Sequence, residues 1–372
     1  MLFRSLRKFS SKHSTFFQRD LIVEKKVNVK PDILGTKFGF GDIATDHMVC
    51  IRHCDKRGWE APCISPLQPI PFHPFNSTLH YALCNYEGMK AYRGSDGSIR
   101  LFRPLDNMKR FVDSNLRLAF PAFDPSELLK VIEDFVKIEQ DWIPQTNDST
   151  LYIRPFAFST TNVLGVHKAS SSMIMVVASP VGSYFSGEIN LSVYEDFWRG
   201  SPKSAASYKI GANYAPTVQI GDQLASKGYS QAIWVYEDKI LESGATNLFF
   251  IIENDEQKLE IVTPPLDGSI LPGITRDSVI QLSQKAVGVP VIQRDFTLTE
   301  FINLHNKGRV REIFVCGTAS VICEVMSLEI RGKVYKMRYP SDRNELLCQR
   351  IKTLLTDIQF GRFSHPFSHV IQ

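Results

Sequence analysis

Lys209 is the residue of this chain whose surroundings most suit chemistry. It lies among small and aromatic residues between Ser207 and Thr217, and no aspartate or glutamate occurs from Gly200 to Gly221. Apolar surroundings without a carboxylate partner favour the neutral form of a lysine amine. A neutral amine attacks carbonyl carbons and forms a Schiff base. The stretch therefore predicts a nucleophilic lysine, and it leaves one alternative open, a lysine that extends from a half-buried loop into solvent.

Three other segments carry groups that bind charges. Residues 271–277 place a glycine just before the first turn of an expected helix, where free backbone amides form an anion site. Glu242 lies among small residues directly before an apolar strand, and a buried carboxylate needs a cationic or donor partner. That partner is either the protonated ring nitrogen of a cofactor or an arginine elsewhere in the chain. Thr318 and Ala319 follow Gly317 at an expected strand end, where a hydroxyl and two amides suit an oxyanion.

Two lobes of mixed α/β structure are expected to position these groups. Turn formers at residues 179–184 predict a hinge between them. We expect a small N-terminal α/β domain over 21–181, a linker over 182–192 and a large C-terminal cofactor-binding domain over 193–372. Apolar periodicity and turn signals predict strands near 47–52, 99–102, 150–158, 172–178, 188–193, 231–236, 248–252, 258–262 and 311–316. They also predict helices that begin near 77, 125 and 272, a helix over 215–227, and a last helix over 342–360.

Composition excludes several classes of protein. A chain of 372 residues with 43% hydrophobic and 22% charged residues is typical of a globular protein with room for two cores. The net charge is only +4 and no basic run follows the first twenty residues, so we expect no nucleic-acid partner. No run of eighteen apolar residues predicts a membrane span. Seven cysteines, an odd number, argue against a disulfide framework, and no spacing predicts a metal site.

The first twenty residues differ from the rest of the chain. They combine five basic residues with five serines and threonines, and no acidic residue precedes Asp20. Arranged as a helix, their apolar and basic side chains would occupy opposite sides. This composition is typical of a mitochondrial transit peptide. We expect residues 1–20 to lie outside the fold, to be removed between about Asp20 and Lys30, and to direct the protein to the mitochondrial matrix. The alternative is a disordered basic tail that carries no targeting signal.

Taken together, these motifs resemble those of the branched-chain amino acid aminotransferases, pyridoxal 5′-phosphate (PLP) enzymes of fold type IV. The resemblance extends from about Lys37 to Gly361. The matching segments are 40–42 (FGD), 45–48 (TDHM), 80–81 (HY), 86–91 (YEGMKA), 100–104 (RLFRP), 151–155 (LYIRP), 180–185 (PVGSYF), 208–214 (YKIGANY), 242–249 (ESGATNLF), 263–266 (TPPL), 271–273 (LPG) and 317–319 (GTA).

The resemblance implies a fold, an activity and a set of partners. The fold would be a two-domain α/β fold (α+β lobes) with the cofactor at the domain interface. The activity would be a reversible, ping-pong transfer of the amino group between L-leucine, L-isoleucine or L-valine and 2-oxoglutarate, carried out by a homodimer. D-amino acid aminotransferases and aminodeoxychorismate lyases share this cofactor and are the alternatives. A non-catalytic protein that keeps the fold is a further alternative, but it need not retain Lys209, Glu242 and Arg103 together.

For the cofactor, the resemblance implies a role for each matching residue. Lys209 would form the Schiff base with PLP and then move a proton between the substrate α-carbon and the cofactor. Glu242 would keep the pyridine nitrogen protonated, and Tyr214 would hydrogen-bond the phenolic oxygen. The phosphate would be held by Arg103, Thr318 and the backbone amides of Ile274 and Thr275.

For the substrate, the resemblance implies an aromatic pocket with one cation. The pocket would be lined by Phe40, Tyr81, Tyr86, Tyr152, Tyr184 and Ala319, some of which would reach in from the partner subunit. Arg154 would meet the distal carboxylate of glutamate or 2-oxoglutarate.

Two residues depart from the pattern of the family. Ala245 stands where a threonine is frequent, which would loosen contacts on the cofactor face. Ser320 stands where the mammalian mitochondrial enzymes begin a redox-active Cys-x-x-Cys pair, so that only Cys323 is left. Since Cys316 is the nearest other thiol and lies on the preceding strand, we expect no disulfide at Cys323.

Overall fold

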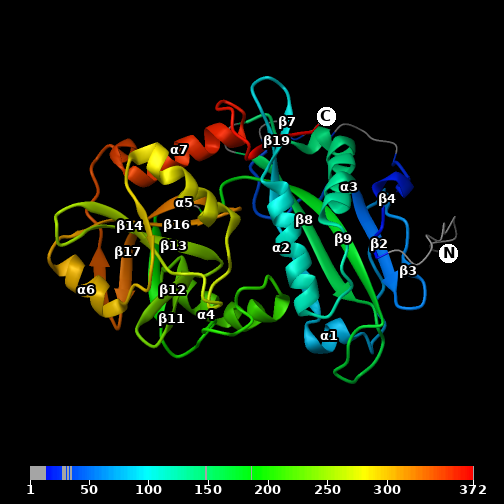
Figure 1. Cartoon of the computed structure of the whole chain (residues 1–372), viewed down its shortest axis with the longest axis horizontal. Helices are drawn as coiled ribbons and strands as arrows, with labels where there is room; N and C mark the ends of the chain where they lie inside the picture. The colour runs from blue at the N-terminus through cyan, green and yellow to red at the C-terminus, as the bar shows by residue number, and fades with distance from the viewer. Residues whose placement is uncertain are drawn as a thin grey trace. The chain divides into compact units, whose positions relative to one another are not determined.

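Two β-sheets organise the chain, one in each of two units (Figure 1). The computed structural model describes residues 14–26, 31, 33, 36–146, 149–185 and 187–371. Within these residues the first unit comprises the chain up to Ser183, the segment Tyr208–Ala212 and the stretch from Gln359 onward. The second comprises Tyr184–Ser207 and Asn213–Ile358. Lys209 therefore belongs to the first unit, although the segments on both sides of Tyr208–Ala212 belong to the second. The linker expected over 182–192 between the two domains stays a prediction.

The sheet of the first unit is almost entirely antiparallel. Among the described residues it has ten strands in the order β1-β4-β2-β9-β8-β6-β7-β19, with β3 beside β2 and β5 beside β8. Only β1 and β4 pair in parallel. The strands are β1 (Ile22–Val23), β2 (His47–Cys54), β3 (Gly58–Trp59), β4 (Cys63–Pro66), β5 (Cys84–Tyr86), β6 (Met89–Arg93), β7 (Ile99–Phe102), β8 (Thr150–Ser159), β9 (Ser171–Val181) and β19 (Ser368–Val370).

Two helices, α2 (Pro104–Arg117) and α3 (Pro125–Ile138), cover one face of this sheet (Figure 1). Helix α3 begins where the sequence predicts, because Asp124 accepts a hydrogen bond from Ser126 N–H at 2.8 Å and Pro125 fits the first turn. Its apolar side packs into the same core as α2 and the sheet. A short helix, α1 (Ser77–Tyr81), and single turns at Gln18–Asp20 and Gln140–Trp142 complete the unit.

In the second unit, six strands pair in a closed ring. The order is β12-β11-β10-β17-β16-β13, and β13 pairs again with β12; β14 and β15 continue from β13, and β18 pairs with β17. The strands are β10 (Ile189–Tyr194), β11 (Gln231–Tyr236), β12 (Lys239–Ser243), β13 (Thr246–Glu253), β14 (Leu259–Thr263), β15 (Val291–Gln293), β16 (Val310–Gly317), β17 (Val321–Ile330) and β18 (Lys333–Lys336). The helices are α4 (Val218–Ala225), α5 (Ile274–Val287), α6 (Leu298–Asn306) and α7 (Leu347–Gln359), with single turns at Ala215–Thr217 and Arg343–Glu345. The turn Gly211–Asn213 begins in the first unit and ends in the second.

Alternation along β13 explains how both faces of this sheet are covered. Leu248 and Phe250 pack in one core with Phe301 of α6. Phe249 and Ile251 point the other way, into a core that α5 and α7 complete. A strand segment buried on both faces is apolar at successive positions, as residues 248–252 of this strand are. No helix within the described ranges is long and apolar enough to cross a membrane.

The structure corrects several expectations about helices. Residues 104–117 form α2, which the sequence analysis did not predict, because its buried face is partly polar and breaks the apolar periodicity. The helix expected over 215–227 is a 3₁₀ turn at Ala215–Thr217 followed by α4. The last helix begins at Leu347 rather than at 342. The strands expected at 231–236, 248–252 and 311–316 are confirmed as β11, β13 and β16.

The expectation that residues 1–20 lie outside the fold is wrong for the described part, from Ser14 onward. Phe16 is 1% exposed, and its ring lies 5.2 Å from that of Trp59 and 5.6 Å from that of Phe123. The backbone N–H of Gln18 donates to Glu127 at 2.7 Å. These contacts place the end of the basic segment in the core of the first unit, while residues 1–13 lie outside the described residues.

Candidate active site

The backbone of Lys209 is held on two sides within the first unit. Its N–H donates to Ser114 Oγ of α2 at 3.0 Å, and its carbonyl accepts from Tyr86 N–H at 3.1 Å. The next residue, Ile210, forms a β-bridge with Asn85. The lysine segment thus pairs along the edge of β5. Main-chain hydrogen bonds fix the position of the segment, and the side chain of Lys209 makes separate contacts.

The ring of Tyr86 connects Lys209 to Arg154. The Nζ atom of Lys209 and the Cζ atom of Arg154 each lie 4.8 Å from the centre of this ring. Arg154 also lies 5.2 Å from the ring of Tyr152, which in turn meets Phe40 at 4.9 Å, edge to face. The structure therefore brings together five predicted site residues, the amine of Lys209 and the guanidinium of Arg154 among three aromatic rings. Cations over aromatic faces are attracted by the ring quadrupole.

Gly88 is required by this arrangement. A Cβ atom at this position would lie 1.9 Å from Tyr152 Oη, so that any side chain would displace the Tyr152 ring. Lys90 and Tyr152 are paired across β6 and β8, and Tyr152 and Arg154 are two residues apart on β8, so they share a face. Gly88 of the 86–91 motif is thus explained by the Tyr152 side chain, which lies too close to leave room for a Cβ atom.

A buried ion pair anchors the same motif to α2. Arg110 donates to both carboxylate oxygens of Glu87, from Nε at 2.8 Å and from Nη2 at 2.6 Å. Glu87 is fully buried and Arg110 is 8% exposed. The N–H of Glu87 itself donates to the carbonyl of Pro155 on β8 at 2.7 Å. One helix therefore holds both Glu87, through Arg110, and Lys209, through Ser114.

Three predicted pocket residues are not part of this cluster, and one of them, Ala319, lies in the turn between β16 and β17 of the second unit. Tyr81 is exposed at the end of α1, and its hydroxyl donates to the carbonyl of Leu164. Tyr184 belongs to the second unit, where its ring lies 4.9 Å from that of Phe185. Arg103 lies in the first unit at the start of α2, with Nε 2.8 Å from Asp106.

In the second unit, Glu242 of β12 is buried beside a cation. Arg199 donates from Nη1 to Oε1 of Glu242, and the N–H of Leu271 donates to Oε2 at 3.4 Å. The guanidinium of Arg199 also lies 5.3 Å from the centre of the Tyr214 ring. Of the two partners that the sequence left open for Glu242, the structure shows the arginine. A neighbouring guanidinium stabilises the carboxylate in its charged form.

The first turn of α5 has the geometry of an anion site. Its N-cap is Gly273, and no side chain caps the helix, so the amides of Ile274 and Thr275 have no acceptor within it. A Cβ atom at Gly273 would lie 2.1 Å from Asn247 Oδ1, and Asn247 Nδ2 donates to the carbonyl of Leu271 at 3.1 Å. Asn247 of the 242–249 motif therefore shapes the turn that leads into these amides.

Thr318 and Ala319 form the tight turn between β16 and β17. The turn ends at Val321, whose φ of 58° is left-handed and strained for a β-branched residue. The Oγ atom of Ser320 is buried there without a hydrogen-bond partner among the described residues. Strained backbone of this kind clusters at binding sites, which agrees with the anion-binding role expected for this turn.

Cys316 and Cys323 lie on opposite faces of the sheet. Cys323 pairs with Val315, and Cys316 pairs with Ile322, in adjacent rungs of β16 and β17. Since neighbouring rungs point their side chains to opposite faces, the two sulfurs cannot meet. Burial raises the pKa of the Cys316 thiol well above its ordinary value, which keeps it protonated and unreactive.

We therefore predict that mild peroxide forms no disulfide at Cys323 and leaves activity unchanged. Mass mapping of tryptic peptides under non-reducing conditions measures the disulfide, and Cys323→Ser is the control. Inactivation by peroxide that dithiothreitol reverses, and that is absent from Cys323→Ser, would contradict this prediction.

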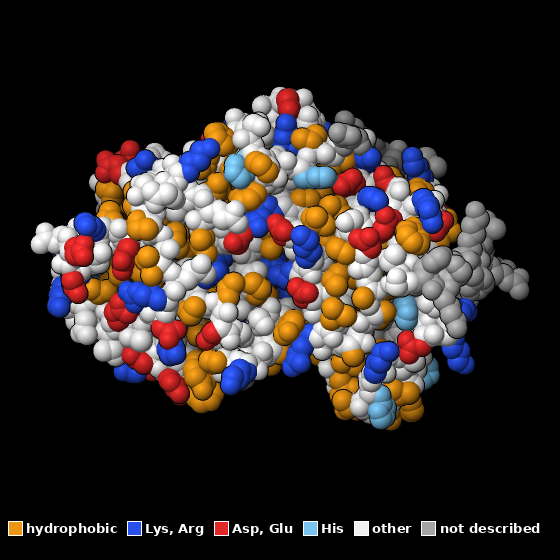
Figure 2. Space-filling model, in the orientation of Figure 1, with side chains coloured by type: hydrophobic (Ala, Val, Ile, Leu, Met, Phe, Trp, Pro, Cys, Tyr) orange, Lys and Arg blue, Asp and Glu red, His pale blue; other side chains and the backbone are white. Residues whose placement is uncertain are grey.

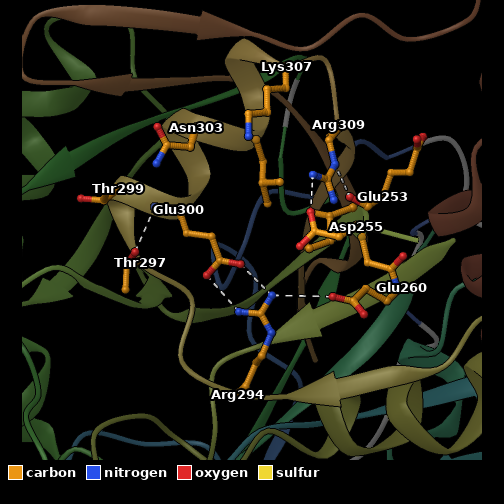
Figure 3. Close-up of a pocket in the computed structure, with 13 residues that line it drawn as sticks. Glu253, Asp255, Glu260, Arg294, Thr297, Thr299, Glu300, Asn303, Lys307 and Arg309 are labelled. Atoms are coloured by element: carbon orange, nitrogen blue, oxygen red, sulfur yellow. Dashed lines mark hydrogen bonds and ion pairs between the residues drawn. The ribbon is translucent and has the colours of Figure 1, made fainter. Parts of the chain in front are cut away.

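A surface hollow of about 430 Å³ lies beside α6 in the second unit (Figure 3). Its charged side chains pair with one another: Arg294 with Glu300 at 2.7 Å, and Arg309 with Asp255 at 2.7 Å. None of the predicted site residues is among the residues that line it. Its partly exposed ion pairs are typical of a solvated surface, so it is not the candidate site.

Three residues of the candidate site escaped sequence reasoning. Arg199, Arg110 and Ser114 lie in windows without a chemical motif, and each acts through a partner distant in the chain. One feature of the sequence could have pointed to them. Pro104 directly follows an expected strand and is typical of the first turn of a helix. In such a helix Arg110 and Ser114, four residues apart, lie on the same face.

Comparison with known proteins identifies the class. Residues 85–328 match the family model of class IV amino-transferases. The chain is 36% identical to the branched-chain-amino-acid aminotransferase of Dictyostelium discoideum over 100% of both chains. It is 37% identical to the mitochondrial enzyme of Bos taurus, over 97% of this chain and 93% of that one. It is 38% identical to the cytosolic enzyme of Rattus norvegicus, over 95% of this chain and 87% of that one.

Solved structures share the fold. The Escherichia coli branched-chain amino acid aminotransferase superposes with a TM-score of 0.71 and 23% identity, over 88% of this chain and 100% of that one. The PLP-form of the Thermobaculum terrenum enzyme superposes with a TM-score of 0.70 and 19% identity, over 88% of this chain and 99% of that one. The expected fold class, two α/β units of the fold-type-IV kind, is confirmed.

With a class IV family match and full-length similarity, the class of this protein is defined: it is a PLP-dependent transaminase. The chain belongs to the class IV aminotransferase family, and within it to the branched-chain-amino-acid aminotransferases. The resemblance seen in its motifs is thereby confirmed. The roles of single residues are untested by these similarities.

Proposed function

We propose that this protein exchanges the amino group of L-leucine, L-isoleucine or L-valine with 2-oxoglutarate in two half-reactions on bound PLP. One observation carries this proposal: the amine of Lys209 and the guanidinium of Arg154 lie over the same Tyr86 ring. Aromatic walls suit an apolar side chain, and a cation among them suits a second carboxylate. A transaminase for these two substrate types needs both.

The residues present fit PLP by their chemistry. Lys209 supplies an amine for the cofactor carbonyl, Glu242 a charged carboxylate for the ring nitrogen, and the uncapped start of α5 an anion site for the phosphate. When bound, PLP supplies an electron sink conjugated with the substrate α-carbon.

The chain's own residues then divide the work. Lys209 Nζ would hold the cofactor through its carbonyl and would move the proton at the substrate α-carbon. Glu242, paired with Arg199, would keep the ring nitrogen protonated, and Tyr214 would bind the phenolic oxygen. The phosphate would be held by Arg103, Thr318 and the amides of Ile274 and Thr275. Side-chain selection falls to Phe40, Tyr81, Tyr86, Tyr152, Tyr184 and Ala319.

A visible spectrum of the purified protein tests the reaction. L-leucine should abolish the absorbance of the lysine-linked cofactor, and 2-oxoglutarate should restore it. The same titration with D-leucine or D-alanine distinguishes the alternatives, because a D-amino acid aminotransferase responds to the D-isomers and a lyase gives no return with 2-oxoglutarate. No response to any amino acid would indicate a non-catalytic protein.

Arg154→Met should impair the glutamate half-reaction far more than the leucine one. A desolvated carboxylate that loses its cationic partner costs about 2–5 kcal/mol, which corresponds to a loss of more than tenfold in kcat/KM. Single-turnover rates with glutamate and leucine measure this ratio. Arg93→Met, on β6 of the same sheet, is the matched control. Equal losses with both substrates would mean that Arg154 only supports the tyrosines around it.

A homodimer is supported by an exposed apolar patch on the first unit. The patch is formed by α1 and the segment after β8, which are joined by the bridge between Asn76 and Asn162. Figure 2 shows hydrophobic side chains gathered at this end of the unit. Its most exposed large side chains are Phe75, Leu79, Leu164 and Val166, at 50%, 60%, 51% and 74%. Patches of this kind mark interaction sites, and light scattering measures the oligomeric state.

We place the protein in the mitochondrial matrix, on the basis of its basic, acid-free leader. Curated relatives of similar identity are mitochondrial in some cases and cytosolic in others. Because Phe16 and Gln18 pack into the first unit, removal of the leader is expected upstream of Phe16 and not near Asp20 to Lys30. The N-terminal mass of protein from its own cells decides this. An intact Met1 in a cytosolic pool would contradict it.

A further inference from the structure

The C-terminal segment adds an edge strand to the first sheet. Strand β19 pairs with β7 through Ser368 with Phe102, His369 with Leu101 and Val370 with Arg100. His369 Nε2 lies 2.8 Å from Glu133 of α3. The N–H of Ile371 donates to the carbonyl of Ile99 at 2.9 Å. The tail is thus tied to the sheet along its length, directly beside the strand that ends just before Arg103.

Arg103 has an unusual backbone conformation at the junction of β7 and α2. Its φ and ψ are 48° and 47°, in the left-handed region that residues with a side chain disfavour. Its N–H donates to the carbonyl of Phe367 at 2.9 Å, and its carbonyl accepts from Asn107 Nδ2 at 3.0 Å. The tail therefore supplies one of the hydrogen bonds that hold this conformation, beside those from Asn107 to the Arg103 carbonyl. The conformation decides where the side chain leaves the backbone.

The side chain of Phe367 contacts the guanidinium of Arg103 directly. The Cζ atom of Arg103 lies 4.5 Å from the centre of the Phe367 ring. That ring is fixed by Phe102, edge to face at 5.8 Å, and by His365 at 4.4 Å. A guanidinium on a fixed aromatic face keeps one orientation and is stabilised by the ring quadrupole.

We propose that β19 belongs to the phosphate-binding apparatus and that Phe367 is the positioning residue of Arg103. The proposal rests on the proposed function, in which Arg103 holds the cofactor phosphate. The tail carbonyl holds the Arg103 backbone, and the tail ring, together with Asp106, orients its guanidinium, so phosphate affinity depends in part on residues beyond the last helix. In this proposal Phe367 acts through Arg103 and not on the cofactor itself.

Affinities of the full-length, cofactor-free chain for PLP and for pyridoxal, which lacks the phosphate, test this proposal. Phe367→Leu keeps apolar bulk and removes the ring; it should raise the Kd for PLP roughly three- to thirtyfold and leave the Kd for pyridoxal unchanged. Phe367→Tyr, which keeps an aromatic ring, should bind PLP with the wild-type Kd. Phe363→Leu, in the same tail, is the matched control, and thermal unfolding checks that each variant folds.

Three outcomes would overturn the proposal. In the first, Phe367→Leu binds PLP as the wild type does while Arg103→Met binds it weakly; the proposed function then stands and the tail has no part in it. Equal weakening for PLP and pyridoxal would show general damage instead of positioning. If Arg103→Met binds PLP normally, the assignment of Arg103 to the phosphate fails as well.

Discussion

Replacement of Lys209 by alanine is expected to abolish leucine transamination while the protein stays folded. The amine both bonds the cofactor carbonyl and moves the α-proton, and loss of a general acid–base group alone lowers rates by about 10²- to 10⁴-fold. We expect a combined loss of about 10⁴-fold or more in kcat. Rates of 2-oxoglutarate-dependent loss of leucine measure it.

The fold should survive because alanine keeps the contacts that position this segment. The hydrogen bonds that tie this segment to Ser114 and Tyr86 are made by the main chain of Lys209. The circular dichroism spectrum and melting temperature should therefore match those of the wild type. Borohydride treatment of the wild type should attach the cofactor to the peptide that contains Lys209.

Lys227→Ala, at an exposed lysine after α4, is the matched control and should keep full activity. Near-normal turnover by Lys209→Ala, or cofactor trapped on a different lysine, would show that another residue performs the chemistry.

Replacement of Arg110 by methionine is expected to cause the largest loss of stability. It leaves the fully buried carboxylate of Glu87 without the two hydrogen bonds that now neutralise it. Breaking a buried pair in this way costs about 3–5 kcal/mol in the free energy of unfolding. The same change moves the motif that lies against Lys209, so activity should fall with stability. Urea unfolding of the apo-protein measures the effect.

The chain offers a matched control for this variant. Arg331 also donates two hydrogen bonds to a glutamate, Glu195, at 2.9 and 2.7 Å, but the pair is exposed. Arg331→Met should cost at most about 1 kcal/mol because water solvates the remaining carboxylate. The double variant Glu87→Met/Arg110→Met should recover part of the lost stability. Equal losses for Arg110→Met and Arg331→Met would mean that burial of the first pair is energetically unimportant.

Local sequence was sufficient wherever the signal is periodic or chemical. The capped, amphipathic start of α3 and the apolar β13 follow from side chains within one window. Lys209 and Glu242 stood out because the residues next to them are unusual for a lysine and a glutamate. Propensity, capping and burial patterns act over a few residues, so short windows contain them.

Tertiary structure alone decided which partners these residues have. Lys209 is bonded to Ser114, 95 residues earlier in the chain, and Glu242 pairs with Arg199, 43 residues earlier. Phe16, which looked like part of a leader, is buried because Trp59 and Phe123 surround it. Helix α2 was missed because its buried face carries Arg110 and Ser114, polar groups that are tolerated there only by their distant partners. A buried polar group is stable only once its partner is in place, and no local window contains that partner.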